Sequence, residues 1–287
     1  EYFITNNYYV VKGVHKVLTF GHPLFLMIGG SLMAWIFVVF CIMLLFVLYM
    51  VKEAHENTVR THMVHAQGQE DEFLIFFISD VHNRRISTTM IEQLEAVEAV
   101  IIGGDFADKR VSLERIEQNI KVLKALGPIY FVWGNNDREV GEERLLALFA
   151  KYDVTVVNNE AVLLPNRANT TWISAINDTS TRAYSFEKAL EKCKDGDITI
   201  FISHNPQVFY KAYPLHKPTL MLGGHLHGGQ LRLGPIAMHP HGSFSVRKGV
   251  PTLISNGYGT TLLPFRFMAK PECHMITIKC EGCPKLD

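Results

Sequence analysis

The sequence predicts a layered α/β domain that follows one membrane-spanning helix. Five short apolar runs of strand length alternate along residues 73–222 with charged stretches whose apolar residues recur every three or four positions. Strands that alternate with helices in this way are typical of an α/β layered domain. A long uncharged run near the N-terminus predicts the membrane span.

The predicted membrane span covers residues 24–51, which contain no charged residue and no histidine. These 28 residues form a helix about 42 Å long, enough to cross a hydrocarbon core about 30 Å thick with some tilt. A cleavable signal peptide has a shorter apolar core of about 7–15 residues, and a buried helix normally carries a polar stripe. We therefore expect a single-pass membrane protein.

Three further segments complete the expected organisation of the chain. Residues 1–23 form a short flank, residues 52–72 a polar juxtamembrane linker or an edge strand, and residues 73–287 a single domain. Basic residues next to the span do not orient it, because Lys12 and Lys16 lie before it and Lys52 and Arg60 lie after it. A short flank before a large domain nevertheless favours a position of that domain on the extracytoplasmic side.

Each expected strand is a continuous apolar run, which suits a strand buried on both faces. The runs are Phe73–Ser79, Val97–Gly103, Ile129–Trp133, Ile198–Ser203 and Thr219–Leu222. Helices are expected between them at Ile86–Ala96, Leu113–Leu126, Val140–Tyr152 and Phe186–Cys193. Later segments with strand character are Leu231–Leu233, Thr252–Ser255 and His274–Lys279.

Charge and cysteine content support neither a nucleic-acid partner nor a zinc site. With 28 basic and 28 acidic residues, the net charge gives no reason to expect nucleic acid as a partner. Cys280 and Cys283 form a CxxC near the C-terminus, but no second CxxC completes a zinc site. We expect a disulfide or two free thiols there.

Potential metal ligands follow each of the five apolar runs. In open α/β sheets, ligands bind beyond the carboxyl ends of the strands, so these side chains are expected to gather there. Carboxylate, amide and imidazole groups suit Mn, Fe or Zn, with Mn favoured here. A bridging carboxylate permits two metal ions about 3.5–4 Å apart, which activate a water and stabilise phosphoryl charge. The predicted ligands are Asp80, His82, Asp105, Asn135, His204, His225 and His227.

The motif series DxH, GDxxD, GNxD, an isolated His and GHxH resembles that of calcineurin-like metallophosphoesterases. The segments SHNP, GGHLHGGQLRL and ISNGYGTTLLPFRFMAKPE are similar to a subfamily with an N-terminal membrane anchor or export signal. The resemblance implies a β-sandwich flanked by helices. It also implies that Asp105 bridges two metals, one held by Asp80, His82 and His227 and the other by Asn135, His204 and His225.

The motif Gly134-Asn135-Asn136-Asp137 departs from that family, most of whose members have His after the metal-binding Asn. Asn136 cannot act as a general acid near neutral pH, and general acid catalysis contributes about 10²–10⁴-fold. Three explanations stay open: a substrate with a good leaving group, an acid from another segment, or a slow sensor protein. We favour the first, with Asn136 and Asp137 as candidate catalytic residues and Asn136 as a hydrogen-bond donor to phosphoryl oxygen.

Substrate-binding candidates lie beside these motifs. Arg84, Arg85 and Arg138 are candidates because guanidinium groups bind phosphate bidentately. His239 and His241 are weaker candidates, and apolar residues of the tail segment (Leu262, Leu263, Phe265, Phe267) are candidates for acyl contact. The leading hypothesis is a membrane-anchored phosphoesterase in which metal-bound hydroxide attacks a phosphodiester, phosphomonoester or pyrophosphate, including lipid-linked ones. The alternative is a membrane-bound metal-binding regulatory or sensor protein with low turnover.

Overall fold

A computed structural model describes residues 23–282, which divide into two units between residues 47 and 48. Within the first unit the described residues are helical and belong to α1, Pro23–Ala54, which continues into the second unit. The stretch Leu32–Ala54 is long and apolar enough to cross a membrane, with a mean hydropathy of 2.9. Its apolar side chains are largely exposed, as expected for the predicted span at residues 24–51.

The second unit contains two six-stranded sheets. In the first sheet, the spatial order is β1 (Thr58–Gln67), β12 (Glu272–Glu281), β2 (Asp71–Ile78), β3 (Ala99–Ile102), β4 (Ile129–Phe131) and β5 (Thr155–Val156). In the second, it is β10 (Ser243–Arg247), β11 (Val250–Ile254), β9 (Leu220–Gly223), β8 (Ile198–Ile202), β7 (Thr171–Ala175) and β6 (Glu160–Leu163). Strands β2 to β5 are parallel, as are β7, β8, β9 and β11, so several carboxyl ends share one edge in each sheet.

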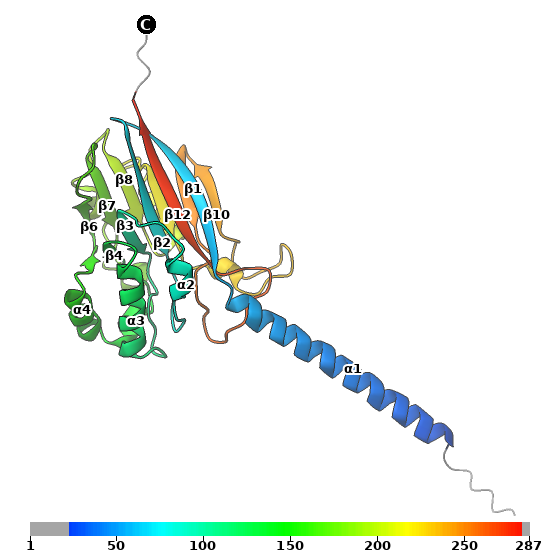
Figure 1. Cartoon of the computed structure of the whole chain (residues 1–287). Helices are drawn as coiled ribbons and strands as arrows, with labels where there is room; N and C mark the ends of the chain where they lie inside the picture. The colour runs from blue at the N-terminus through cyan, green and yellow to red at the C-terminus, as the bar shows by residue number, and fades with distance from the viewer. Residues whose placement is uncertain (1–22, 283–287) are drawn as a thin grey trace, which may run out of the picture. The chain divides into compact units, whose positions relative to one another are not determined.

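The two sheets pack face to face, and helices cover the outer face of the first sheet (Figure 1). Alternate side chains of one strand enter different layers, as a pleated strand requires. Phe77 of β2 packs in the core between the sheets, whereas Phe76 packs against α3 (Leu113–Lys124) and α4 (Glu142–Lys151). Phe201 of β8 packs against α5 (Phe186–Leu190) on the other outer face.

The predicted fold class is confirmed as mixed α/β with two sheets. All five predicted apolar runs are strands, namely β2, β3, β4, β8 and β9, and α3, α4 and α5 lie inside predicted helices. The helix predicted at Ile86–Ala96 is wrong over most of its length, since α2 covers only Thr88–Ile91. The buried residues Met90 and Ile91 lie in this short helix, and the helix does not reach Val97, whose amide donates to the Leu126 carbonyl.

The sequence left two alternatives for residues 52–72, and the structure has the edge strand. Strand β1 pairs in parallel with β12 over ten residues, from Thr58 to Gln67, and is the outermost strand of the first sheet. The folded sheet thus begins before Phe73. The strand predicted at Leu231–Leu233 is wrong, since only isolated bridges form there. Strands β5, β6, β7 and β10 were not predicted.

The C-terminal CxxC is only partly within the described residues. Cys280 is buried in β12, in the core between the two sheets, rather than at a frayed end. Cys283 lies outside the described residues, so the predicted disulfide stays a prediction.

Candidate metal centre

The loops that follow the parallel strands are tied to one another by backbone hydrogen bonds. The Asp80 amide donates to the Gly104 carbonyl, and the His82 amide donates to the Asp105 carbonyl at 3.0 Å. The loop after β11 joins them, because the Tyr258 amide donates to the Ser79 carbonyl. These bonds fix the ends of β2, β3 and β11 relative to one another. The side chains that leave these loops therefore converge on one place.

Five of the predicted ligands have a left-handed backbone conformation. Their φ angles lie between 49° and 71°, in the region that L-residues rarely adopt: Asp80, His82, Asp105, His225 and His227. Each such residue costs about 1–2 kcal/mol compared with a right-handed conformation. Strain of this kind persists where the surrounding structure holds it and is typical of functional sites. This backbone conformation lets both side chains of a DxH or HxH motif point toward the same centre.

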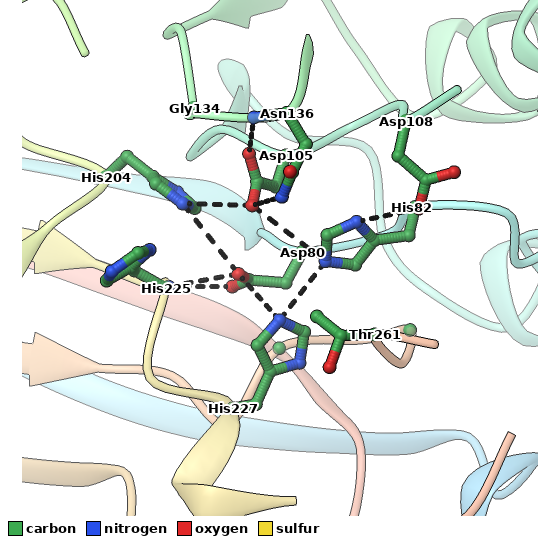
Figure 2. A network of polar contacts seen from close by, with 12 residues as sticks. Asp80, His82, Asp105, Asp108, Gly134, Asn136, His204, His225, His227 and Thr261 are labelled. Carbon is green, nitrogen blue, oxygen red and sulfur yellow. Dashed lines mark hydrogen bonds and ion pairs between the residues drawn. The ribbon is translucent and has the colours of Figure 1, made fainter. Parts of the chain in front are cut away.

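Six of the seven predicted ligands form two groups whose ligand atoms lie within 4.8 Å of one another: Asp80, His82 and His227; Asp105, His204 and His225 (Figure 2). In the first group, Nε2 of His227 lies 3.3 Å from Asp80 Oδ1 and 3.1 Å from His82 Nε2. In the second, Nε2 of His204 lies 3.3 Å from Asp105 Oδ2. The grouping agrees with the ligand assignment that the motifs imply.

Asp105 lies between the two groups. Its Oδ2 atom is 3.3 Å from His204 in one group and 3.9 Å from His82 in the other. This is the position that a bridging carboxylate requires. Gly134 permits it, because a Cβ atom on that residue would overlap the backbone nitrogen and the carboxylate of Asp105.

Partners outside the two groups orient the imidazole rings. The His204 Nδ1 atom lies 2.8 Å from the Gly103 carbonyl, and His82 Nδ1 lies 3.2 Å from Asp108 Oδ2. Arg110 in turn holds the Asp108 carboxylate through an ion pair. Each ring therefore turns its Nε2 atom toward the centre, as metal-binding histidines do when a second group binds the other nitrogen.

The electrostatics of the centre are those of a cation site. Although burial raises the pKa of Asp105, the imidazoles of His204 and His82 hold it below its usual range. Burial lowers the pKa of His204, but the carboxylates of Asp105 and Asp80 raise it to about 10. The pKa of His227 falls to about 3, chiefly through burial. Neighbouring positive charge thus stabilises the ionised form of the buried Asp105 carboxylate, and a bound metal cation would supply such charge.

The residues of the centre fit a pair of divalent metal ions. The buried Nε2 atom of His204 lies 3.3 Å from Asp105 Oδ2 but makes no hydrogen bond among the described residues. This nitrogen faces the centre and is available as a metal ligand. Carboxylate oxygens and imidazole nitrogens together suit borderline-hard divalent metals. The six grouped residues would hold the ions, with Asp105 between them.

The two asparagines of the GNND motif have different surroundings in the structure. Asn135 is exposed, and its side chain makes no hydrogen bond within residues 23–282, so its role as a ligand stays a prediction. Asn136 holds Asp105, because its backbone N–H donates to Oδ1 at 2.8 Å and its Nδ2 donates to Oδ2 at 2.7 Å. Asn136 also lines a small pocket of about 160 Å³ that opens over His82.

Asp137 is corrected from a catalytic to a supporting role. Its side chain is fully buried and accepts hydrogen bonds from the backbone amides of Gly134, Asp105 and Ala107. Burial, followed by the charge of Asp105, raises its pKa to about 7. Asp137 thus joins the loops after β3 and β4 and has no face toward a substrate.

Two of the three arginine candidates bond to other residues of the protein. Arg84 donates to the backbone carbonyls of Tyr258 and Glu56 and stacks on the Tyr258 ring. Arg138 is bonded to Glu142 and Asn177 and stacks on Trp133, and it does not line the pocket over His82. Arg85 is exposed and makes no hydrogen bond or ion pair with any residue that the structure describes.

A second, apolar pocket of about 500 Å³ borders the centre at His225 and His227. Leu262, Leu263 and Phe265 line it, and so does His239. Phe267 instead contacts the ring of Tyr49, with centroids 6.2 Å apart. His241 bonds to Gly242 and Asn256 and does not line this pocket.

Several residues that shape the site were not singled out from the sequence. Asp108 was visible as the last residue of GDxxD, but nothing in the motif indicates its contact with His82. Thr261 lines both pockets beside the centre (Figure 2). Arg266 is fully buried and donates to the carbonyls of Asn256, Gly259 and Ala269, and so fixes the loop beside His227. No local pattern distinguishes a buried arginine of this kind from a solvated one.

Comparison with known proteins agrees with this geometry. Residues 73–229, more than half of the chain, match the family model described as calcineurin-like phosphoesterase. The chain belongs to the calcineurin-like phosphoesterase family. Members of this family use divalent metals, and membership makes the chain a phosphoester hydrolase by class.

The similar proteins include bacterial and mammalian members. Uncharacterized protein YpbG of Bacillus subtilis is 36% identical over 230 residues, covering 78% of this chain and 89% of its own length. Phosphodiesterase YaeI of Escherichia coli is 24% identical, covering 72% and 82%. A transmembrane protein with a metallophosphoesterase domain from Bos taurus is 24% identical, covering 71% and 52%. The apolar helix α1 and the last of these suggest a single-pass membrane protein.

Proposed function

We propose that this protein is a membrane-anchored binuclear metal-dependent phosphoesterase whose substrates are phosphodiesters or pyrophosphates. One observation carries the proposal: two three-residue ligand groups meet at Asp105 in a buried site beneath an open pocket. Two divalent ions in such a site supply activation of a water and neutralise charge on phosphoryl oxygens. Mn is favoured by the mixture of oxygen and nitrogen donors.

The residues of the chain set which substrates suit the site. Asn136 holds Asp105 and lines the pocket over His82, but it cannot protonate a leaving group. Substrates whose leaving group departs as a stable anion therefore fit best, which favours an activated diester or a pyrophosphate over an alkyl monoester. Asn136 has a second amide hydrogen with which to bind a phosphoryl oxygen.

Helix α1 and an apolar pocket beside the centre support a protein that acts at a membrane. Helix α1 is the proposed anchor, with the catalytic domain on the extracytoplasmic side. The apolar pocket beside His225 and His227 suits the hydrocarbon part of a lipid-linked substrate, because Leu262 and Leu263 leave apolar surface exposed there.

The second candidate is a membrane-bound metal-binding sensor with low turnover. The observation that favours it is Asn136, whose amide is already bonded to Asp105. Turnover separates the two candidates, since a sensor needs the metals but not hydrolysis.

The test is hydrolysis of bis(p-nitrophenyl) phosphate by the Mn-loaded full chain in detergent. We expect turnover in the wild type and in Asp195→Ala, a control at an exposed turn, and loss of both metal and turnover in Asp105→Ala. Absence of wild-type turnover with Mn, Fe and Zn, for diester and pyrophosphate substrates alike, favours the sensor. Full activity of Asp105→Ala contradicts the metal assignment itself.

A further inference from the structure

A pocket of about 430 Å³ lies beside the end of α1 and is unusually basic. Four of its lining residues are arginines: Arg84, Arg85, Arg110 and Arg115. No acidic residue is among the described residues that line it. His55, one residue beyond α1, also lines the pocket. Its walls come from the loops after β2 and β3, from α3, and from residues 260–264.

Most of this positive charge is not neutralised by the protein. Arg84 bonds only to neutral acceptors, the carbonyls of Tyr258 and Glu56 and the Asn57 amide oxygen. Arg115 bonds to the carbonyl and the side-chain oxygen of Asn83. Arg85 has no partner within the described part of the chain. Three guanidinium groups thus share one pocket without a carboxylate, and such an arrangement is stabilised when an anion binds.

Arg110 is the exception, and it connects the pocket to the metal centre. Its guanidinium pairs with Asp108, which contacts His82, and it also donates to the Leu262 carbonyl at 2.7 Å. Arg110 and Leu262 line both the basic pocket and the small pocket over His82 and Asn136. The basic pocket and the small pocket beside the metal centre therefore adjoin one another at these two residues.

We propose that this four-arginine pocket is a second anion site that binds a phosphate-class group in addition to the one at the metal centre. Guanidinium groups bind phosphate oxygens in pairs and stay charged at all relevant pH values. The group is either the headgroup phosphate of a membrane lipid or a second phosphate of a soluble substrate. This inference rests on the proposed function, and in the second case it specifies the substrate as a phosphoester that carries a further anionic group.

Arg85 is the residue with which to test the pocket. It is exposed and makes no contact that supports the fold, so replacing it leaves the protein folded. We expect Arg85→Glu to weaken anion binding at least tenfold and Arg85→Lys to stay within about threefold of the wild type. Arg144→Glu, an exposed position on α4, makes the same charge change outside the pocket and is the matched control.

The probes are phosphonates, whose P–C bond resists hydrolysis. The soluble probe is the phosphonate analogue of glycerol 3-phosphate, and the lipid probe is its diacyl form. Bound molecules per Mn-loaded full chain are counted by native mass spectrometry near the wild-type dissociation constant. We expect one fewer bound molecule in Arg85→Glu than in the wild type, Arg85→Lys or Arg144→Glu.

The two probes distinguish the source of the anion. If Arg85→Glu binds fewer molecules of the soluble probe than Arg144→Glu does, the anion is a second substrate phosphate. If the number of bound molecules differs with the diacyl probe alone, the anion is a lipid headgroup. Equal counts in Arg85→Glu and Arg144→Glu with both probes overturn the proposal. Hydrolysis of bis(p-nitrophenyl) phosphate, measured on the same samples, tests the proposed function separately, because that substrate has a single phosphate.

Discussion

Replacement of Asp108 by Asn tests whether contacts outside the ligand groups control metal affinity. Asp108 Oδ2 lies 3.2 Å from Nδ1 of His82 and is itself held by Arg110. The His82 and Arg110 partners keep the pKa of Asp108 below its usual range despite its burial, so this carboxylate is ionised. Its charge stabilises the N–H on Nδ1 and leaves Nε2 as the metal-binding atom. Loss of such a partner typically costs 10–100-fold in metal affinity.

We therefore expect Asp108→Asn to raise the Mn dissociation constant by about 10–100-fold, equivalent to about 1.4–2.7 kcal/mol. The assay is calorimetric titration of Mn into the full chain in detergent, combined with the Mn dependence of aryl diester hydrolysis. At saturating Mn the turnover should recover to within a few-fold of the wild type, because Asp108 does not belong to either ligand group.

Asp195→Asn is the control, at an exposed turn before β8. An unchanged Mn dissociation constant in Asp108→Asn would refute the reasoning. A turnover that stays low at saturating Mn would also refute it, because the residue would then act on substrate rather than on His82.

Two further predictions address the centre and the sheet. Gly134→Ala should abolish Mn binding and turnover, since its methyl group would overlap Asp105; wild-type affinity by calorimetry would contradict this. Burial and the neighbouring charges of His62 and Arg60 hold the pKa of His274 well below its ordinary value. The unfolded chain therefore binds a proton that the folded chain excludes, so stability falls as pH decreases below about 6.5, by up to about 1.4 kcal/mol per pH unit. Urea unfolding at pH 7.5 and 5.5 should show that the free energy of unfolding falls less in His274→Gln than in the wild type. An equal fall in both proteins would contradict the linkage.

The local sequence pattern was sufficient for the strands and for most metal ligands. Phe73–Ser79 and Ile198–Ser203 are continuous apolar runs, and strands buried on both faces have this pattern wherever they lie in a sheet. Asp80 and His204 follow those runs directly, so each lies at the carboxyl edge of its own sheet, and the packing of the two sheets brings those edges together. Short motifs with glycine also predict tight turns, in agreement with the left-handed residues at the centre.

Roles that depend on a distant partner could not be inferred in this way. Arg84 and Arg85 are neighbours in sequence, yet one is held by Tyr258, 174 positions away, and the other is free within the described residues. Asp137 follows the candidate catalytic Asn136 directly, but it is buried under three backbone amides. Burial and pairing are properties of the assembled loops, and neither has a periodic signal along the chain.

By itself the sequence determined an apolar helix, an alternation of strands and helices, and a ligand series with the order of a two-metal centre. Only the tertiary structure decided that β1 is the edge strand of the first sheet, that Asp137 supports loops rather than substrate, and that four arginines from three segments share one pocket. The physical reason is the range of the interactions. Periodicity and turn chemistry act over a few residues, whereas the charge environment of a side chain depends on segments that meet only in the fold.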